Sequence, residues 1–269
     1  MKALLITACV APVTCFGAWS LVDDFDSYGT GALNGKGGWV AEANWTVISA
    51  PPGGTGLVAS VLNAAATRNA YKPLALSIAN ANTATSLFFR MYRSGGVNFS
   101  IGLSDVAAPA AFADFEAQLN AQHTASPNTI KVRDGAAIDD LGPNSFVDAA
   151  WYNVWMVVNN SADTYQLWIE QGDTVPAFAT NHILDPVGGG PGDFDFGFRN
   201  GAAANPLQTF FMAMGGDTLT GRIHVDDIYI DNSGQNLASP VVPEPASGFF
   251  ILAGAAVGAA RRRRAAQRA

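Results

Sequence analysis

The chain has 269 residues, of which 14% are charged, and its formal net charge at pH 7 is −7. Between Ala18 and Val242 there are 21 acidic but only 9 basic residues, and such an acidic body argues against a nucleic-acid partner, which needs clustered Lys and Arg to neutralise phosphates. The length suits one large β domain or two smaller ones, and the 28 glycines and low charge are typical of an extracellular all-β protein.

Residues 1–17 are predicted to be a secretory signal peptide. Lys2 supplies the positive start, an apolar stretch follows, and cleavage after Gly17 places the small residues Cys15 and Gly17 where a signal peptidase requires them. The stretch ending at Cys9 resembles a lipobox, but too few residues precede this cysteine to form the hydrophobic segment of a lipoprotein signal. Both cysteines would leave with the signal, so the mature fold has to rely on its apolar core instead of disulfides.

Residues 18–236 are predicted to form a single all-β domain. Clusters of Gly, Pro, Asn, Asp and Ser recur about every ten residues, and short β-branched or aromatic runs lie between them. No segment shows an apolar period of 3.6 residues over three turns. Ala111–Leu119 fits either a short helix or another strand. Many short strands at this spacing indicate a sandwich or a barrel.

The clearest local element is an antiparallel hairpin. Its second strand has Tyr165, Leu167 and Ile169 alternating with polar residues, which is the period of a half-buried strand. The turn formers of Asn159–Asp163 join this strand to the apolar run Trp151–Val158. One face of the hairpin is therefore expected in a core.

Three segments together resemble the laminin-G-like, concanavalin-type jelly rolls of bacterial surface proteins. They are the hairpin Trp151–Asp173, the stretch Asp23–Trp39 near the mature start, and Ile223–Val241 near the end. The resemblance covers roughly Leu21 to Pro240. It implies a two-sheet antiparallel jelly-roll sandwich in which the first and last strands are neighbours and the two ends of the domain lie close together.

Concanavalin-type folds also include glycoside hydrolases, which hold two carboxylates a few ångströms apart. Their strand motif Glu-x-Asp-x-x-Glu is absent, and no Gly-x-Ser-x-Gly occurs. The glutamates and histidines of the body are scattered without the spacing of a catalytic pair or a zinc site: Glu42, Glu116, Glu170, His123, His182 and His224. We therefore expect no enzymatic activity.

Four aspartates near the two ends of the domain predict a structural calcium site. Asp24 and Asp26 lie on the same side of an extended segment, and Asp226 and Asp227 lie on opposite sides of the last strand. If the terminal strands are neighbours, carboxylates from both can converge on one Ca²⁺, which prefers oxygen ligands. Related jelly rolls often hold a calcium ion at such a place. Alternatively, the aspartates cap turns or face water.

Trp168 is the candidate glycan-binding residue. It falls on the polar face of its strand, opposite Tyr165, Leu167 and Ile169, so the alternation predicts that its ring is exposed and available to stack on a sugar. The other tryptophans of the body are expected in the core or against the sheets: Trp39, Trp45, Trp151 and Trp155.

The end of the chain differs from the body. After a linker at 237–242, Pro243, Glu244 and Pro245 precede the uncharged segment 246–260 and the basic end 261–269, which contains Arg261, Arg262, Arg263 and Arg264. As a helix, 246–260 would extend about 22 Å, which is shorter than the roughly 30 Å hydrocarbon core of a bilayer. It can cross as a short transmembrane helix if the arginines snorkel on the cytoplasmic side and the bilayer thins.

This order of Pro-Glu-Pro, apolar segment and terminal arginines resembles the PEP-CTERM sorting signal. The resemblance implies a Gram-negative bacterium that makes exopolysaccharide, and a membrane-embedded exosortase that recognises Pro243, Glu244 and Pro245 and cuts near them. The two prolines fix an extended segment that a protease can accommodate. The protein would be anchored transiently in the inner membrane and then passed to the cell surface, the outer membrane or the extracellular matrix.

Together these features predict an exported, non-enzymatic protein that serves as a structural or glycan-binding component of the cell surface or matrix. Its expected partners are an exosortase-like processing enzyme and extracellular polysaccharide. The alternative is a carbohydrate-active enzyme, a glycoside hydrolase or lyase, on the same fold.

Overall fold

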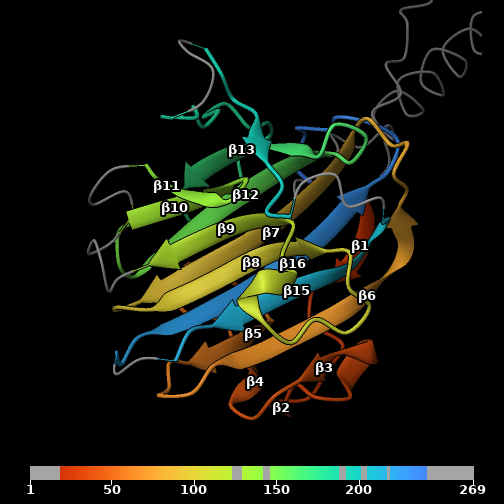
Figure 1. Cartoon of the computed structure of the whole chain (residues 1–269). Helices are drawn as coiled ribbons and strands as arrows, with labels where there is room; N and C mark the ends of the chain where they lie inside the picture. Colours follow the sequence, from red (N-terminus) through yellow and green to blue (C-terminus); the bar gives the residue numbers. More distant parts are fainter. Residues whose placement is uncertain are drawn as a thin grey trace, which may run out of the picture.

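The computed structural model describes residues 19–122, 129–141, 146–187, 192–200, 205–216 and 219–240 (Figure 1). The predicted signal peptide, the Pro-Glu-Pro motif, the predicted transmembrane helix and the arginine cluster lie outside these residues. Within them, no helix has the length and apolar character needed to cross a membrane.

The described body consists of two antiparallel sheets that face one another (Figure 1). In order of pairing, the nine-stranded sheet of this body contains β14 (Phe196–Gly197), β13 (Thr164–Gln171), β12 (Ala150–Asn159), β7 (Thr85–Ser94), β16 (Arg222–Asp231), β5 (Leu57–Leu62), β4 (Trp45–Ser49) and β2 (Gly31–Ala32), and β1 (Ser20–Asp23) pairs with β16. The predicted all-β jelly-roll sandwich is confirmed.

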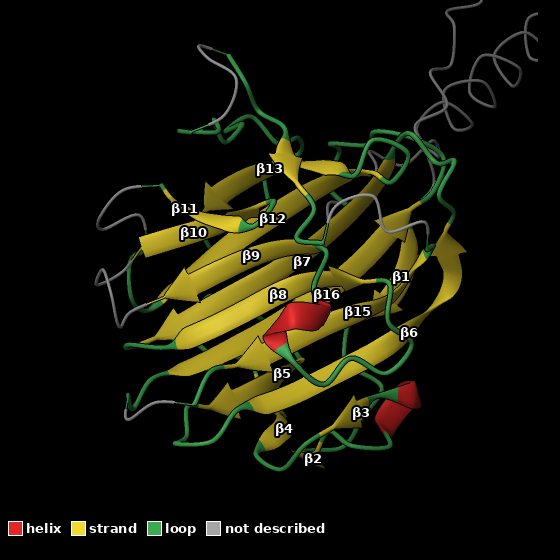
Figure 2. Ribbon diagram, in the orientation of Figure 1, coloured by secondary structure: helices red, strands yellow, loops and turns green. Residues whose placement is uncertain are grey.

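The described part of the second sheet has seven strands. In order these are β11 (Ala137–Asp140), β10 (Thr129–Asp134), β9 (Ala117–Gln122), β8 (Asn98–Ser104), β15 (Leu207–Met214), β6 (Arg68–Ile78) and β3 (Val40–Ala41). Two single-turn 3₁₀ helices complete the elements, η1 (Lys36–Gly38) and η2 (Phe112–Asp114) (Figure 2). Ala111–Leu119, which fitted either a helix or a strand, contains both, because η2 leads directly into β9.

The predicted hairpin and the predicted pairing of the terminal strands are both present. β12 pairs with β13 from Tyr152 to Asn159, and β1 pairs with β16. Beyond β16 the chain lies against its own beginning, because the Trp19 indole N–H donates to the Ala238 carbonyl at 3.1 Å. The two ends of the body are therefore held together by backbone pairing and by this hydrogen bond.

The central strands of the nine-stranded sheet are buried on both faces. In β12, Tyr152 and Val154 point into the main core between the sheets, whereas Trp151 and Trp155 pack into smaller apolar clusters on the outer face. A strand covered on both sides needs apolar residues at nearly every position, which explains the uninterrupted apolar character of β12. The four tryptophans predicted to be internal, Trp39, Trp45, Trp151 and Trp155, are at most 1% exposed.

A buried carboxylate fixes the start of the body to the seven-stranded sheet. Asp23 is 4% exposed, and its Oδ2 accepts hydrogen bonds from the Tyr28 hydroxyl at 2.6 Å, the Trp39 indole N–H at 2.7 Å and the Lys72 ammonium at 2.6 Å. Its Oδ1 accepts the Phe25 backbone N–H at 2.9 Å. One carboxylate thus satisfies four donors, of which the Lys72 ammonium lies 49 positions away in the sequence.

Candidate functional site

The outer face of the seven-stranded sheet carries a polar hollow of about 200 Å³. In β8, β9 and β10 the side chains alternate between the core and this face, and the outward residues are polar. Figure 2 shows η2 lying over the same face of the sheet. The hollow is lined by Asn98, Ser100, Phe112, Gln118, Asn120, Arg133, Ile138 and Arg199.

The floor of the hollow is a closed network of amide and hydroxyl groups. The Gln118 amide donates to Ser100 Oγ at 2.9 Å and to Asn120 Oδ1 at 2.7 Å, and Ser100 donates to the same Asn120 oxygen at 2.6 Å. All three side chains are at most 5% exposed. A buried network in which the members bond to one another holds its donors and acceptors in fixed positions.

Two guanidinium groups border this network. Arg133 Nη1 donates to the carbonyls of Ala136 and Ala137 at 3.0 and 2.9 Å, whereas its buried Nε has no hydrogen-bond partner. Arg199 Nη1 donates to the Phe112 carbonyl at 2.7 Å. Burial, and then the charge of Arg199, lowers the pKa of Arg133. The ion pairs found among the described residues include neither arginine, although the charges of Glu116 and Asp114 act on Arg199 from nearby.

Glu116 is a carboxylate beside the hollow. It lies directly before β9 and two residues before Gln118, so its side chain is on the same outer face as that of Gln118. It accepts hydrogen bonds from the Asn200 backbone N–H at 3.1 Å and from the Asn200 side-chain amide at 2.6 Å. Burial is the largest cause of the raised pKa of Glu116, and the bonds from Asn200 oppose it. A carboxyl group with these properties can hold a proton more readily than an exposed glutamate.

None of the residues that line the hollow was predicted as a site residue, although the sequence contains a pattern that predicts the strands carrying them. Polar and apolar residues alternate in Asn98–Ser104, Ala117–Gln122 and Thr129–Asp134. This pattern predicts half-buried strands. It does not reveal that the three strands are neighbours, or that Arg199 reaches the same face from another part of the chain.

The four aspartates of the predicted calcium site lie at the junction of the terminal strands. Asp24 and Asp26 directly follow β1, and Asp226 and Asp227 lie at an irregularity in β16, where Asp227 has a φ of +50°. The charges of Asp24 and Asp26 contribute to raising the pKa of Asp227, after the larger effect of burial. The structure therefore brings the four carboxylates into electrostatic contact.

Several protein groups already bind these carboxylates. Arg90 forms an ion pair with Asp227 at 3.4 Å, Asp26 accepts the Leu57 N–H at 2.7 Å, and Asp226 accepts the Asp227 N–H at 2.9 Å. Within the described ranges, no three of the four bring oxygen atoms within 4.8 Å of one another. A calcium ion at this place would have to displace the Arg90–Asp227 pair, and the calcium site stays a prediction.

The predicted exposure of Trp168 is wrong. Trp168 is 5% exposed, and its ring stacks on that of His182, with centroids 3.9 Å apart and an angle of 8°. His182 in turn stacks on Phe194 at 3.9 Å. Trp168 does lie on the face opposite Tyr165, but the segment after β13 covers that face. A sugar ring has no access to the covered indole, so the physical basis for a glycan-binding role of Trp168 is removed.

A separate cavity of about 610 Å³ lies beyond β13. It is bordered by the ends of β10 and β11, by β12 and β13, and by the segment 181–186. Its lining includes Ile130, Asp140, Leu141, Tyr152, Ile169, His182 and Ile183.

Comparison with solved structures supports the fold. The catalytic domain of a glycoside hydrolase family 131 protein from Coprinopsis cinerea matches with a TM-score of 0.54 and 11% identity, over 84% of this chain and 99% of that chain. Peanut lectin matches with a TM-score of 0.47 and 11% identity, over 77% and 95%. Lectin II from Ulex europaeus has a TM-score of 0.45 and 8% identity, over 74% and 94%. The first of these matches indicates a shared fold, and its 11% identity leaves the activity open.

Comparison by sequence identifies the end of the chain. No curated protein matches this sequence. Residues 241–264 match the PEP-CTERM protein-sorting motif, in the position where Pro243, Glu244 and Pro245 and the arginine cluster had indicated it. This motif implies an exported protein that transits the membrane of a Gram-negative bacterium and is processed by the membrane enzyme exosortase. The chain is thus a concanavalin-like jelly roll that carries a PEP-CTERM sorting motif at its C-terminal end.

Proposed function

We propose that this protein is a non-enzymatic, glycan-binding component of the cell surface or extracellular matrix, and that the polar hollow of the seven-stranded sheet binds an acidic polysaccharide. The single observation that carries this proposal is the composition of the hollow. Amide and hydroxyl groups are suited to the hydroxyls of a sugar, and the guanidinium groups of Arg133 and Arg199 are suited to a carboxylate or sulfate on it.

The surroundings of the hollow agree with this ligand class. The body is acidic as a whole, so two arginines without an ion pair at one place are a local exception to its charge. Phe112 offers a partly buried ring at the border of the hollow, where it can pack against the apolar face of a sugar. The network of Ser100, Gln118 and Asn120 is formed before any ligand binds, which lowers the entropic cost of binding.

Binding measurements with purified full-length protein test this proposal. We expect polygalacturonate to bind and dextran, a neutral polysaccharide, to bind at least tenfold more weakly, because only the acidic polymer neutralises the two guanidinium groups. Arg133→Gln should weaken polygalacturonate binding about tenfold or more, by isothermal titration calorimetry. The matched control is Arg222→Gln, since Arg222 lies on the other sheet and donates to Ser60. Equal affinities for wild type and Arg133→Gln would contradict the proposed site.

The second candidate, a carbohydrate-active enzyme, is favoured by one observation. Glu116 is buried beside the hollow and its pKa is raised, which is a property of a general acid. Release of reducing sugars or unsaturated products from the same two polysaccharides, abolished in Glu116→Gln, would show that the protein is an enzyme and overturn the non-enzymatic proposal.

Processing at the Pro-Glu-Pro motif is expected to determine the final location. In a host that contains an exosortase, we expect the mature protein to lack the residues that follow the motif and to fractionate with the cell surface or matrix. Replacing Pro243, Glu244 and Pro245 with alanine should leave the full-length C-terminal end in the inner-membrane fraction. Intact-mass measurement of each fraction checks both statements, with Ser239→Ala as the control. A triple variant that is trimmed and released like the wild type would disprove the role of the motif.

A further inference from the structure

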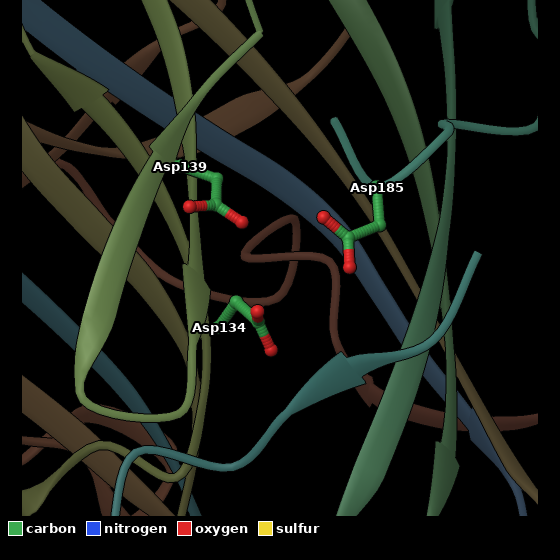
Figure 3. A group of neighbouring side chains, drawn as sticks. All are labelled: Asp134, Asp139 and Asp185. Atoms are coloured by element: carbon green, nitrogen blue, oxygen red, sulfur yellow. The ribbon is translucent and has the colours of Figure 1, made fainter. Parts of the chain in front are cut away.

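Two aspartates of one hairpin and a third, distant in sequence, meet at one edge of the sandwich. Asp134 ends β10, Asp139 belongs to β11, and Asp185 lies in the segment that follows β13. Each offers one oxygen atom, and these three atoms all lie within 4.8 Å of one another. Figure 3 shows the carboxylates of Asp134 and Asp139, from one hairpin, facing that of Asp185, from a separate segment.

One oxygen of this group, Asp139 Oδ2, is buried without a hydrogen-bond partner. Asp134 Oδ1 accepts the Gly197 N–H at 2.6 Å, and Asp185 Oδ1 accepts the Val187 N–H at 2.9 Å. Asp139 is 4% exposed, and its buried Oδ2 has no hydrogen-bond partner. A buried carboxylate oxygen that lacks a donor is unfavourable unless a cation or a proton binds it.

Basic side chains do not compensate these charges. Among the described residues, the ion pairs include none of the three aspartates, and the nearest lysine of the hairpin, Lys131, pairs with Asp140. Burial, then the charges of Asp134 and Asp185, and last a hydrogen bond with Asp185, raise the pKa of Asp139 to about 6. No basic group opposes this shift, in contrast to Asp227, which is paired with Arg90.

We propose that Asp134, Asp139 and Asp185 bind a calcium ion. Ligand oxygens lie about 2.4 Å from Ca²⁺, so two of them on one ion are separated by at most about 4.8 Å, and the three carboxylates meet this condition. Ca²⁺ takes oxygen ligands in flexible geometry and completes its shell with backbone carbonyls and water. The absence of histidine and cysteine from the group disfavours zinc and copper.

The position of the ion gives it a defined role. Asp140 and Leu141 follow Asp139 directly, and Leu184 and Pro186 flank Asp185; all four line the cavity of about 610 Å³. A calcium ion would tie the β10–β11 hairpin to the segment 183–187. The ion would thereby fix two walls of this cavity. This inference is independent of the polar hollow and of the aspartates at the terminal strands.

Calorimetric titration of the EDTA-treated full-length protein tests the proposal. We expect wild-type protein to bind Ca²⁺ in preference to Mg²⁺, and Asp139→Asn, which keeps the shape of the side chain, to bind at least one fewer ion. Asp140→Asn is the matched control, because the neighbouring Asp140 points to the other side of β11, is exposed and pairs with Lys131. Asp227→Asn distinguishes this site from the aspartates at the terminal strands, because this variant should still bind the ion that Asp139→Asn loses.

A second variant keeps the test valid if Asp139→Asn does not fold. Asp134 is only partly buried, and in Asp134→Asn the side-chain oxygen can still accept the Gly197 N–H. We expect this variant to fold and to bind Ca²⁺ at least tenfold more weakly. Absence of Ca²⁺ binding in wild type, unchanged stoichiometry in both variants, or tighter binding of Mg²⁺ would each overturn the proposal. If the wild type does not bind Ca²⁺, Asp139 and Asp185 share a proton in place of the ion, and Asp139→Asn should melt at a higher temperature than wild type at pH 8 without metal.

Discussion

Replacing Asp23 with alanine is expected to lower the melting temperature by about 10 °C. The substitution leaves Lys72 as a largely buried ammonium without its counter-charge, and it removes the acceptor of the Tyr28 hydroxyl and the Trp39 indole. Breaking a buried ion pair by removing one partner costs about 3–5 kcal/mol, and in a domain of this size each kcal/mol corresponds to roughly 2–4 °C.

Thermal unfolding by differential scanning calorimetry in EDTA measures this effect. Asp24→Ala is the matched control, because Asp24 is the adjacent aspartate and makes one short-range hydrogen bond, to the Asp26 N–H at 3.2 Å in an exposed position. We expect the control to shift the melting temperature by less than about 3 °C. Equal shifts for the two variants would show that the four hydrogen bonds to Asp23 do not carry this stability.

Replacing Asp226 with asparagine is expected to stabilise the protein at neutral and alkaline pH in the absence of calcium. Burial, followed by the charge of Asp227, raises the pKa of Asp226 to about 9, whereas the ordinary value is 3.8. Between these two values the unfolded chain has released the proton and the folded chain has kept it. The wild type therefore loses stability as the pH rises from about 4 to about 9, and asparagine, which has no proton to release, removes this loss.

Melting temperatures at half-unit steps from pH 4 to pH 9 check this prediction. The difference between Asp226→Asn and wild type should be close to zero at pH 4 and should grow in favour of the variant as the pH rises. His224, whose pKa is lowered to about 4 by burial, titrates in both proteins and cancels in the difference. Asp140→Asn serves as the control for a change of net charge, because Asp140 is exposed.

Calcium gives this experiment a second result. If the aspartates at the terminal strands bind Ca²⁺ as predicted, the sign of the effect should reverse when calcium is added, because asparagine is a weaker ligand than a carboxylate. A variant that is more stable than wild type at pH 8 with and without calcium would remove the prediction of a calcium site at Asp24, Asp26, Asp226 and Asp227.

Two kinds of feature could be predicted from the sequence: the inward face of a strand with regular alternation, and the pairing of the first and last strands. The alternation at Tyr165, Leu167 and Ile169 placed these residues correctly in the core, and β1 pairs with β16 as expected. The same alternation gave the wrong exposure for Trp168. Alternation assigns each residue of a strand to one of two faces, but it does not show whether other segments cover the outer face. Here the segment containing His182 folds back over the outer face of the sheet.

The candidate sites were harder to predict because they assemble from distant positions. Asp139 lies in β11 and Asp185 in the segment that follows β13, 46 positions later in the sequence, and they meet only in the folded sandwich. Likewise Arg199 Nη1 donates to the side-chain oxygen Oε1 of Gln118 at 3.4 Å from a segment far along the chain. No local pattern specifies such encounters, since they depend on strand order, and strand order is fixed by the packing of the whole core.

The contact between Trp19 and Ala238 determines how the body is presented before it is released. One residue, Ala18, separates the predicted signal peptide from Trp19, and the sorting motif begins only a few residues after Ala238. Both membrane-directed segments therefore leave the body from one point, beside β1 and β16 of the nine-stranded sheet. Because the polar hollow lies on the outer face of the opposite sheet, we expect it to face away from the inner membrane while the protein is still tethered there.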